Sequence, residues 1–502
     1  MGKNENEINP LLLLLPIDGN SSRFNTTCPA LGLFNSMALR QYLTQVASSP
    51  WIAAPMVHQS ELTFRLLCRR YNVVMANTPM LHSRIFANTP AYRKTEFQTH
   101  EEDQPLVAQL ASSDPSDLLS AAQHLYGRCD VIDLNFGCPQ AIARRGNYGA
   151  FLLSDIPKLQ SLVSCLAESN GGRVPVSCKI RLLPSHDATI QVVQALVEAG
   201  CQMLTVHGRT REQNKQNSGA ASWTAVRRVV EYMNECYPEV VVVSNGGVGS
   251  LKEARDCVEY TGACGVMAAE ALLCNPAMFY DVDLDIDNFE VQQLHEVGRQ
   301  HTTCNTIGMD VNEVNMSLFN LLVEIRQLAL AQEYLELAKV HSQQYLKPVR
   351  SHLFKLCHIS LCISQNHGVR TIFAKARSLE EMEIGVATLQ NNARARSQAA
   401  LQVEQRREDI AIEILQRLLV DMENNEHECK RSARLAVAAV AIVEKSCHVG
   451  HPWEEGKNSS MMPKLWYYRH PREEVEGKED KKMVYKTVGL YNSTEGTEHV
   501  CL

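Results

Sequence analysis

The feature that most constrains the fold is a series of eight short β-prone runs that alternate with stretches of helix length. The runs begin at residues 51, 73, 105, 131, 176, 203, 241 and 265. The stretches between them, such as 188–200 and 250–262, carry apolar residues at helical spacing. Nearly continuous apolar strands that alternate with helices indicate a parallel sheet whose outer face is covered. The pattern therefore predicts an α/β protein built on a TIM (β/α)8 barrel, with a doubly wound open sheet as the alternative.

Changes of pattern divide the 502 residues into five segments. Residues 1–47 lack a sustained period and are expected to be a disordered N-terminal extension. Residues 48–284 are predicted to form the barrel, and residues 285–330, rich in Asn and Gln, an irregular connection. Residues 331–394 are predicted to form a smaller all-helical domain. The remaining residues, 395–502, are predicted to be a C-terminal extension that is first helical and then disordered.

Composition excludes some classes of protein. The chain carries 49 Lys and Arg against 56 Asp and Glu, a net charge of −7. This balance argues against a uniformly cationic nucleic-acid binder, although it is compatible with a local basic face. The 17 cysteines show no CxxC pair and no regular disulfide spacing, which indicates reduced thiols inside a cell. We expect a cytoplasmic protein, with the nucleus as the alternative location.

Two segments near the chain ends bear on membranes and metals. The apolar run Leu11–Leu15 is stopped by Pro16 and is too short to cross a bilayer or to act as a signal peptide. We therefore expect no membrane association. The segment "CHVGH" at 447–451 lacks a second pair of ligands, so no metal site is expected there.

Nearly every β-prone run ends on residues that a structural strand does not need. In a TIM barrel these strand ends meet on one face, which carries the active site. The residues are Pro55, Met56, Thr78, Pro79, Gln109, Asn135, Cys138, Lys179, Arg181, His207, Arg209, Asn245, Gly246 and Gly247. Such amides and cations suit a polycyclic, anionic ligand. The Gly-rich turn "SNGGVGS" before a helix is typical of a phosphate site. Flavin mononucleotide (FMN) fits both features, because it combines a polycyclic ring with one phosphate.

Cys138 lies in the stretch "VIDLNFGCPQ", between a glycine and a proline. Most cysteines fill cores, but a thiol beyond the carboxyl end of a barrel strand faces the cavity. With an ordinary pKa of about 8.5 the thiol is mostly protonated at neutral pH and can act as a general acid. Lys179 would be costly to bury without an anionic partner or ligand, which favours a functional role. A lone histidine such as His207 is more often a structural residue.

The motifs "APMV", "DLNFGCPQ", "RRGNYGAFLL", "CKIR" and "TVHGRTREQ" occur in this order. In this combination the chain resembles the tRNA-dihydrouridine synthase family over about residues 48–281. The stretches "NTPMLHSRIF", "RRGNYGAFLL" and "VRSHLFKLCH" are most similar to the branch that modifies uridines 16 and 17 in the D-loop of tRNA. The helical stretch 331–392 resembles the C-terminal tRNA-binding domain of that family.

The resemblance implies an FMN enzyme that is reduced by NADPH. Reduced flavin passes a hydride to C6 of uracil, and Cys138 gives the proton to C5. Within the same motifs, Gln109 and Lys179 are implied to bond the flavin ring, and Asn135 to face both flavin and base. The remaining residues implied to contact the cofactor are Pro55, Met56 and Val57 along the ring, His207 beside it, and Asn245, Gly246, Gly247, Ala269 and Glu270 around the phosphate.

The implied partner is tRNA and not DNA. A uracil inside folded tRNA must leave its stack before a flavin can face it, which costs a few kcal/mol, and basic side chains on the phosphates can offset that cost. The candidates are Arg144, Arg145, Arg181, Arg209, Lys347, Arg350, His352 and Lys355. The last four follow one another closely enough to share one broad face of a helix that would contact tRNA. The alternative interpretation is that this face is an ordinary solvated surface. The oligomeric state stays open, with a monomer as the expectation.

The chain departs from the family pattern at several positions. Ser222 replaces an acid, Gly247 stands where Asp or Asn is usual, and Asn77 stands where an aromatic residue is commoner. Two alternatives to a tRNA-uridine reductase remain open for the chain as a whole. One is another FMN barrel that acts on a free small molecule, and the other is a non-catalytic tRNA-binding relative.

Overall fold

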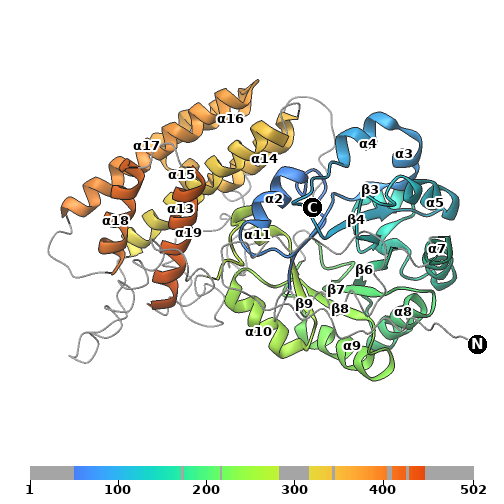
Figure 1. Cartoon of the computed structure of the whole chain (residues 1–502). Helices are drawn as coiled ribbons and strands as arrows, with labels where there is room; N and C mark the ends of the chain where they lie inside the picture. Colours follow the sequence, from blue (N-terminus) through green and yellow to red (C-terminus); the bar gives the residue numbers. More distant parts are fainter. Residues whose placement is uncertain are drawn as a thin grey trace, which may run out of the picture.

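A computed structural model describes residues 50–169, 171, 174–214, 218–281, 316–341, 345–403, 410–424 and 429–446. A closed parallel barrel lies beside a region of long helices (Figure 1). The barrel strands are β1 (Trp51–Ala53), β2 (Met75–Asn77), β4 (Leu106–Ala111), β5 (Val131–Phe136), β6 (Val176–Leu182), β7 (Met203–Thr210), β8 (Val241–Asn245) and β9 (Gly265–Ala268). β1 pairs with both β2 and β9, and β2 pairs with β4, so the ring is closed. The predicted TIM barrel is confirmed and the open sheet is excluded.

Alternation along the strands separates two apolar layers. Ile52, Val107 and Met203 belong to one buried cluster that takes residues from seven barrel strands. Their strand neighbours Ala108 and Leu204 belong to a different cluster, which also contains residues of the surrounding helices. Because successive side chains of a strand point to opposite faces, the first cluster fills the barrel and the second lies between strands and helices.

The helices that cover the barrel are α2 (Leu62–Arg69), α5 (Pro115–Gln123), α7 (Ile156–Ser169), α8 (His186–Glu198), α9 (Trp223–Cys236), α10 (Leu251–Thr261) and α11 (Glu270–Cys274). Side chains at their N-termini accept hydrogen bonds from backbone amides in the first turn, as Ser185 does for α8 and Ser250 for α10. Gly262 ends α10 in the left-handed conformation (φ 69°), which favours glycine.

Two excursions depart from simple strand–helix alternation. Between β2 and β4 the chain forms β3 (Leu81–His82), α3 (Ser83–Asn88) and α4 (Pro90–Glu96), and β3 pairs with the far end of β4. After β5 it forms α6 (Ala141–Arg145) and the 3-10 turn η1 (Gly149–Phe151). The sequence pattern did not predict β3, since a two-residue strand has no periodicity.

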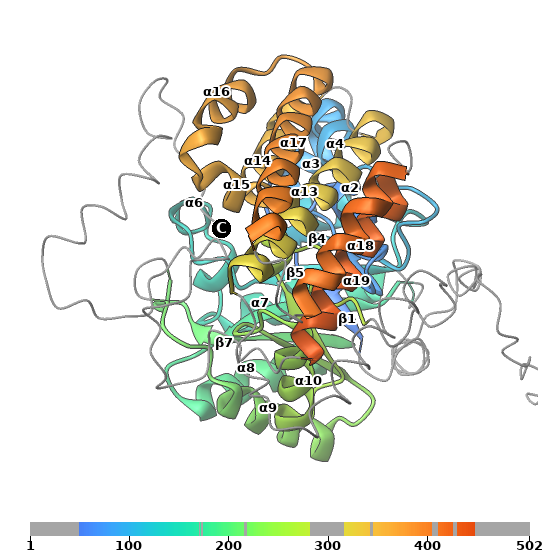
Figure 2. The ribbon, with the colours of Figure 1, turned by 90° about the vertical axis from the view of Figure 1, so that its left-hand side faces the viewer.

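The helical region comprises α13 (Met316–His341), α14 (Leu346–Leu356), α15 (His358–Cys362), α16 (His367–Lys375), α17 (Leu379–Val403), α18 (Ile410–Asn424) and α19 (Cys429–Ser446), with the 3-10 turn η5 (Ser364–Asn366) between α15 and α16. α13 contacts α14, α17, α18 and α19, and also α2 of the barrel. Figure 2 shows α17, α18 and α19 alongside α13. None of the helices in the described ranges is long and apolar enough to span a membrane.

Two predicted boundaries are wrong. The connection predicted for 285–330 is helical from Met316 onward, because α13 begins there. The boundary between 394 and 395 falls inside α17, and α19 packs on α13, so the helices after residue 394 belong to the same core. The disorder predicted for 1–47 and for the last part of 395–502 concerns residues outside the described ranges, as does most of the connection.

Candidate active site

Polar side chains from adjacent strands lie side by side at the carboxyl ends of β4 to β8. The register pairs Gln109 with Asp133, Asn135 with Lys179, and Arg181 with His207. His207 in turn pairs with Asn245. The prediction that the strand ends bring these residues together is therefore confirmed for β4 to β8.

A hydrogen-bonded chain joins β4, β5 and β6 on this face. Asn135 Nδ2 donates to Gln109 Oε1 (2.8 Å), and Gln109 Nε2 donates to Asp133 Oδ2 (2.8 Å). The other carboxylate oxygen of Asp133 accepts from the Ser177 hydroxyl (2.6 Å). Burial raises the pKa of Asp133 to about 6, although the bonds from Ser177 and Gln109 and the charge of Lys179 act against the rise. The amides of Gln109 and Asn135 are therefore held in fixed orientations.

Sequence reasoning missed Asp133. The signal was an acid inside the apolar stretch "VIDLNF", two residues before Asn135. Since alternate residues of a strand share a face, Asp133 had to point the same way as Asn135.

The Cys138 loop is fixed through its backbone. Asn135 Oδ1 accepts hydrogen bonds from the amides of Gly137 (3.0 Å) and Cys138 (2.9 Å). Arg181 Nε donates to the carbonyl of Gly137 (2.9 Å), and the Ala150 amide donates to the carbonyl of Cys138 (3.0 Å). The partners in these four hydrogen bonds belong to β5, β6 and η1, and together they hold the loop in a single position.

Burial raises the pKa of the Cys138 thiol above its ordinary value, and a backbone hydrogen bond and the charges of Arg181 and Lys179 only partly oppose this. The thiol therefore carries its proton at neutral pH. Tyr148 is buried, packs in the same small cluster as Cys138, and stands edge-on to His82 with ring centroids 5.5 Å apart. Burial and the neighbouring Cys138 raise the pKa of Tyr148 to about 12, so its hydroxyl also stays protonated.

Three cations gather on β6 and β7. Burial and the nearby Arg181 lower the pKa of Lys179 to about 8, against the opposing effect of Asp133 and Cys138. Burial and the charge of Arg209 lower the pKa of Arg181 to about 10. Arg181 also donates through Nη1 to the carbonyls of Thr210 (2.8 Å) and Gln213 (3.1 Å). Arg181 thus ties the Cys138 loop to the end of β7.

His207 is a neutral imidazole. Burial, together with the positive charges of Lys179, Arg181 and Arg209, lowers its pKa well below the ordinary value. Its Nε2 lies 3.3 Å from Nη1 of Arg209, which can only donate. Nε2 is therefore the acceptor, and the ring proton resides on Nδ1. Arg209 also donates from Nε to the carbonyl of Gly219 (3.1 Å).

The turn after β8 presents backbone next to His207. Gly246 (φ 101°) and Gly247 (φ 77°) both occupy the left-handed region, and a Cβ on Gly246 would lie 2.8 Å from Cδ2 of His207. Trp223 Nε1 donates to the Gly246 carbonyl (3.1 Å), and Asn245 Nδ2 donates to the Met267 carbonyl of β9 (2.8 Å).

The neighbouring strand end continues this edge of the barrel. Ala269 precedes α11, and Glu270 is the first residue of that helix and is exposed. The two glycines after β8, beside the end of β9, fit the phosphate of a mononucleotide, and the neutral His207 beside Lys179 fits the rim of a flavin ring.

The loop after β1 carries Pro55, Met56 and Val57. Met56 is buried, and its amide donates to the Ser60 hydroxyl (3.0 Å), which donates back to the Met56 carbonyl (3.2 Å). Pro55 and Val57 are half-buried.

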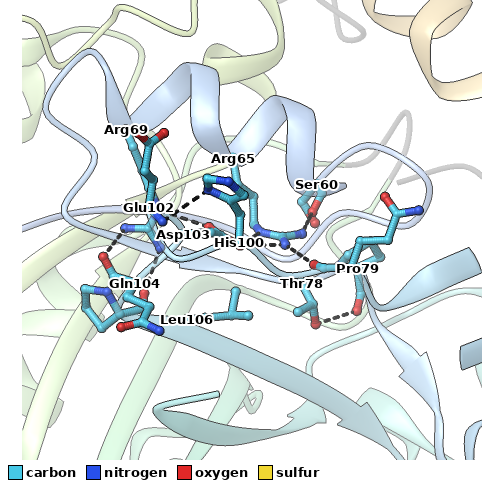
Figure 3. Close-up of polar contacts among 12 residues, drawn as sticks. Ser60, Arg65, Arg69, Thr78, Pro79, His100, Glu102, Asp103, Gln104 and Leu106 are labelled. Atoms are coloured by element: carbon cyan, nitrogen blue, oxygen red, sulfur yellow. Dashed lines mark hydrogen bonds and ion pairs between the residues drawn. The ribbon is translucent and has the colours of Figure 1, made fainter. Parts of the chain in front are cut away.

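A buried ion-pair cluster supports this loop from α2. Arg65 Nη1 donates to the Ser60 carbonyl (2.6 Å), while Arg65 and Arg69 converge on Asp103 at 2.6 and 3.0 Å (Figure 3). Asp103 has no exposed surface, so this pair of guanidinium groups is what makes its burial tolerable.

Three of the eight predicted tRNA-contacting residues are exposed. Arg144 and Arg145 are exposed on α6, directly after the Cys138 loop, and Lys347 is exposed at the start of α14. His352 has no exposed surface, and its Nε2 lies 3.1 Å from Glu61 Oε2. A fully buried ring cannot reach a phosphate, so the prediction for His352 is wrong.

Arg350 and Lys355 are half-buried and have partners within the protein. Arg350 donates to the carbonyls of Phe373 (2.9 Å) and Ala376 (2.8 Å), and Lys355 donates to Gln59 Oε1. The single exposed face predicted for these α14 residues is therefore wrong, because the face that carries His352 packs on the barrel.

Two departures from the family pattern have local explanations. Ser222 caps α9 by accepting from the Ala225 amide, as an aspartate would. Asn77 is buried and donates to the Ala53 carbonyl (2.9 Å), so it joins β2 to β1 from the inward face of the barrel that it shares with Met75. Within the described ranges no group of three or more His, Cys, Asp or Glu side chains is placed to hold a metal ion, and the segment 447–451 lies outside them.

The chain is similar to one known protein family and to several named proteins. The dihydrouridine synthase family model matches residues 52–394. A Mus musculus protein named tRNA-dihydrouridine(16/17) synthase-like is 36% identical over 356 residues, which are 70% of this chain and 63% of that protein. Its Rattus norvegicus counterpart is 37% identical over 349 residues, 69% of this chain and 67% of that protein.

A Saccharomyces cerevisiae tRNA-dihydrouridine(16/17) synthase is 38% identical over 262 residues, 50% of this chain and 60% of that protein. The chain therefore spans about two thirds or less of the length of these relatives. Since the family model covers well over half of the 502 residues, the chain belongs to the dihydrouridine synthase family.

Proposed function

We propose that the protein is an FMN-dependent enzyme that reduces uridines 16 and 17 in the D-loop of tRNA to 5,6-dihydrouridine, with NADPH as the reductant. The observation that carries this proposal is Cys138: a protonated thiol on a loop fixed by four backbone hydrogen bonds, at the carboxyl end of a barrel strand. The names of the relatives support the substrate, the uridine positions and the use of NAD(P)+.

FMN fits the residues at the strand ends. Its phosphate would lie against Gly246, Gly247 and the segment Ala269–Glu270, and its ring against Met56, Gln109, Lys179 and His207. When bound and reduced, FMN supplies the hydride that adds to C6 of uracil. Because its pKa is lowered, the His207 imidazole is neutral and adds no positive charge to the site; its Nε2 accepts a hydrogen bond from Arg209.

Cys138 acts as the general acid toward C5 of the base. Its thiol proton moves to C5, and the thiolate that remains lies near Lys179 and Arg181. Lys179, with a pKa of about 8, is mostly cationic at neutral pH and stabilises that thiolate. Asn135 holds both the Cys138 amide and Gln109, so the acid and the ring-binding amide keep a fixed separation.

The substrate surface includes Arg144 and Arg145. Both follow the Cys138 loop directly on α6 and are exposed, which suits contacts with the phosphates that flank an extruded uridine. Arg209 is half-buried and contacts His207 and the Gly219 carbonyl, which suits a role beside the cofactor better than one on a phosphate backbone.

The test uses purified full-length protein and tRNA from cells that lack it. We expect bound FMN, oxidation of NADPH, and appearance of dihydrouridine at positions 16 and 17. Cys138→Ala should keep FMN bound and reducible while product formation collapses. Reduction of a free uracil compound without tRNA would favour the small-molecule barrel, and a flavin-free protein that binds tRNA would favour the non-catalytic relative.

A further inference from the structure

The helical region meets the barrel along α2. At one end of α2, Phe64 stacks on His352 with ring centroids 4.4 Å apart and planes inclined by 12°, and neither residue has exposed surface. At the other end, Arg70 Nη1 and the Tyr71 hydroxyl each donate to Glu333 of α13 at 2.6 Å. Figure 1 shows α2 between the barrel and helices α13 and α14.

Glu61 stands at the N-cap of α2 but does not cap it, because its side chain makes no hydrogen bond to the first-turn amides. Its two oxygens accept instead from the helical region: Oε1 from the Tyr334 hydroxyl (2.7 Å) and Oε2 from His352 Nε2 (3.1 Å). A carboxylate only accepts, so His352 Nε2 carries a proton. Burial tends to raise the pKa of Glu61, but His352 and these hydrogen bonds outweigh it and lower that pKa.

Gln59 makes a second link to the same helix. Its Nε2 donates to the Ser351 hydroxyl (3.1 Å), and its Oε1 accepts from Lys355. Gln59 and Glu61 therefore flank Ser60, whose hydroxyl closes the loop back onto Met56. The amides of Gln59 and Ser60 also donate to the Met56 carbonyl, at 3.0 and 3.1 Å.

We infer that Glu61 is a positioning residue through which the docked helical region sets the Pro55–Ser60 loop against the flavin, an inference that rests on the proposed function. The loop has no strand or helix of its own. Ser60 holds the shape of the loop through its hydrogen bonds with Met56. Ser60 is itself held by Arg65, which donates to its carbonyl, and by its sequence neighbours Gln59 and Glu61, which contact the helical region. The helical region thus contributes to the cofactor site before any tRNA arrives.

Glu61→Gln tests this with a matched control, Glu333→Gln. Both changes remove a carboxylate from the interface between the barrel and the helical region. Glu333, however, contacts Arg70 and Tyr71, which follow the C-terminal end of α2, whereas the loop precedes the N-terminal end. Gln59→Ala is a second variant that breaks a link without removing a charge, in case Glu61→Gln fails to fold.

The first measurement is amide hydrogen exchange in the full chain without FMN. We expect the amides of residues 56–60 to exchange about tenfold faster in Glu61→Gln and to change in the same direction in Gln59→Ala, while Glu333→Gln alters exchange only around Tyr71. Unchanged exchange at 56–60 in Glu61→Gln and Gln59→Ala overturns the inference, whether or not FMN binds.

The second measurement is FMN affinity together with the visible spectrum of the bound flavin. Glu61→Gln should lose about tenfold in affinity and shift the spectrum at saturating FMN, whereas Glu333→Gln should stay within about twofold of the native protein. Equal losses of FMN affinity in both variants would mean that Glu61 only stabilises the fold and does not position the loop. A native protein that binds no FMN refutes the proposed function instead, and the exchange data still decide the role of Glu61.

Discussion

Asn135 holds the backbone of Cys138: its Oδ1 accepts the Cys138 amide at 2.9 Å while its Nδ2 donates to Gln109 at 2.8 Å. One side chain thus sets both the thiol and an amide on the neighbouring strand. The distance between the proton donor and the ring-binding group therefore depends on a residue that need not itself transfer anything.

Asn135→Ala should reduce dihydrouridine formation about 100-fold, because a displacement of about 1 Å at a reacting group costs that much. Asn135→Asp keeps the acceptor for the Gly137 and Cys138 amides and should lose less. Single-turnover rates with reduced flavin measure both. Asn88→Ala, which removes an exposed asparagine bonded only to its own helix, is the control. Equal rates for the two Asn135 variants would contradict the role of the Oδ1 acceptor.

Gly149→Ala should cost about 3 kcal/mol in the free energy of unfolding and also lower activity. Gly149 has a φ of 68°, and a Cβ there would lie 2.7 Å from the Cys138 carbonyl oxygen. Gly127 has a φ of 73° with nothing within 4 Å of its Cβ position, so Gly127→Ala should cost only the left-handed strain of about 1 kcal/mol. Denaturant titration compares the two. Similar losses would mean that the contact with the Cys138 loop is unimportant.

Asp133→Asn should stabilise the protein near pH 8 and not near pH 4. The folded-state pKa of Asp133 is raised to about 6 from an ordinary value of 3.8. A carboxyl group with a raised pKa favours folding below about pH 4, and that contribution is lost as the pH rises through about 6. The asparagine carries no charge. Its oxygen can still accept from Gln109, and its amide can donate to the Ser177 hydroxyl. The free energy of unfolding should therefore rise by about 2 kcal/mol at pH 8. Thermal unfolding from pH 4 to 8 measures it, with Ser177→Ala as the control for the lost hydrogen bond. A pH-independent difference would contradict the ionisation of Asp133.

Reversing the charge of Arg144 and Arg145 to Glu should weaken tRNA binding and reduce the slope of affinity against salt concentration by about 2. The matched control reverses Arg227 and Arg228, an adjacent exposed pair on α9. Affinities measured at several salt concentrations separate the two pairs. An equal effect of both pairs would indicate non-specific attraction of the whole surface.

The sequence predicted the barrel well because its strands are buried on both faces. Each run of Val, Ile, Met and Ala leaves a local signal, and all eight barrel strands begin within two residues of the predicted starts. The start of α13 was missed, because complete burial hides the period of a helix. Residues 322–338 are buried almost all round, by α2, α14, α17 and α19, so this helix has no polar face to reveal its period.

The site divides in the same way. Gln109, Asn135, Lys179 and His207 were predictable because strand topology alone brings strand ends together. The pair of Glu61 with His352 was not, since 291 residues separate them and neither position carries a motif. Spacing along α14 placed His352 among basic residues of one helix, but spacing does not tell which face of a helix packs against another domain.

The packing of α19 on α13 has a consequence for synthesis. The barrel can close as soon as β9 has emerged to pair with β1, well before the rest of the chain exists. α13, in contrast, can pack on α2, α14 and α17, but it cannot bury the surface that contacts α19 until that helix, about a hundred residues later, has left the ribosome. During that interval the nascent chain exposes this apolar surface of α13 beside a finished barrel. A stop codon after residue 403, which spares every residue of the candidate site, should therefore yield a protein that needs chaperones or aggregates.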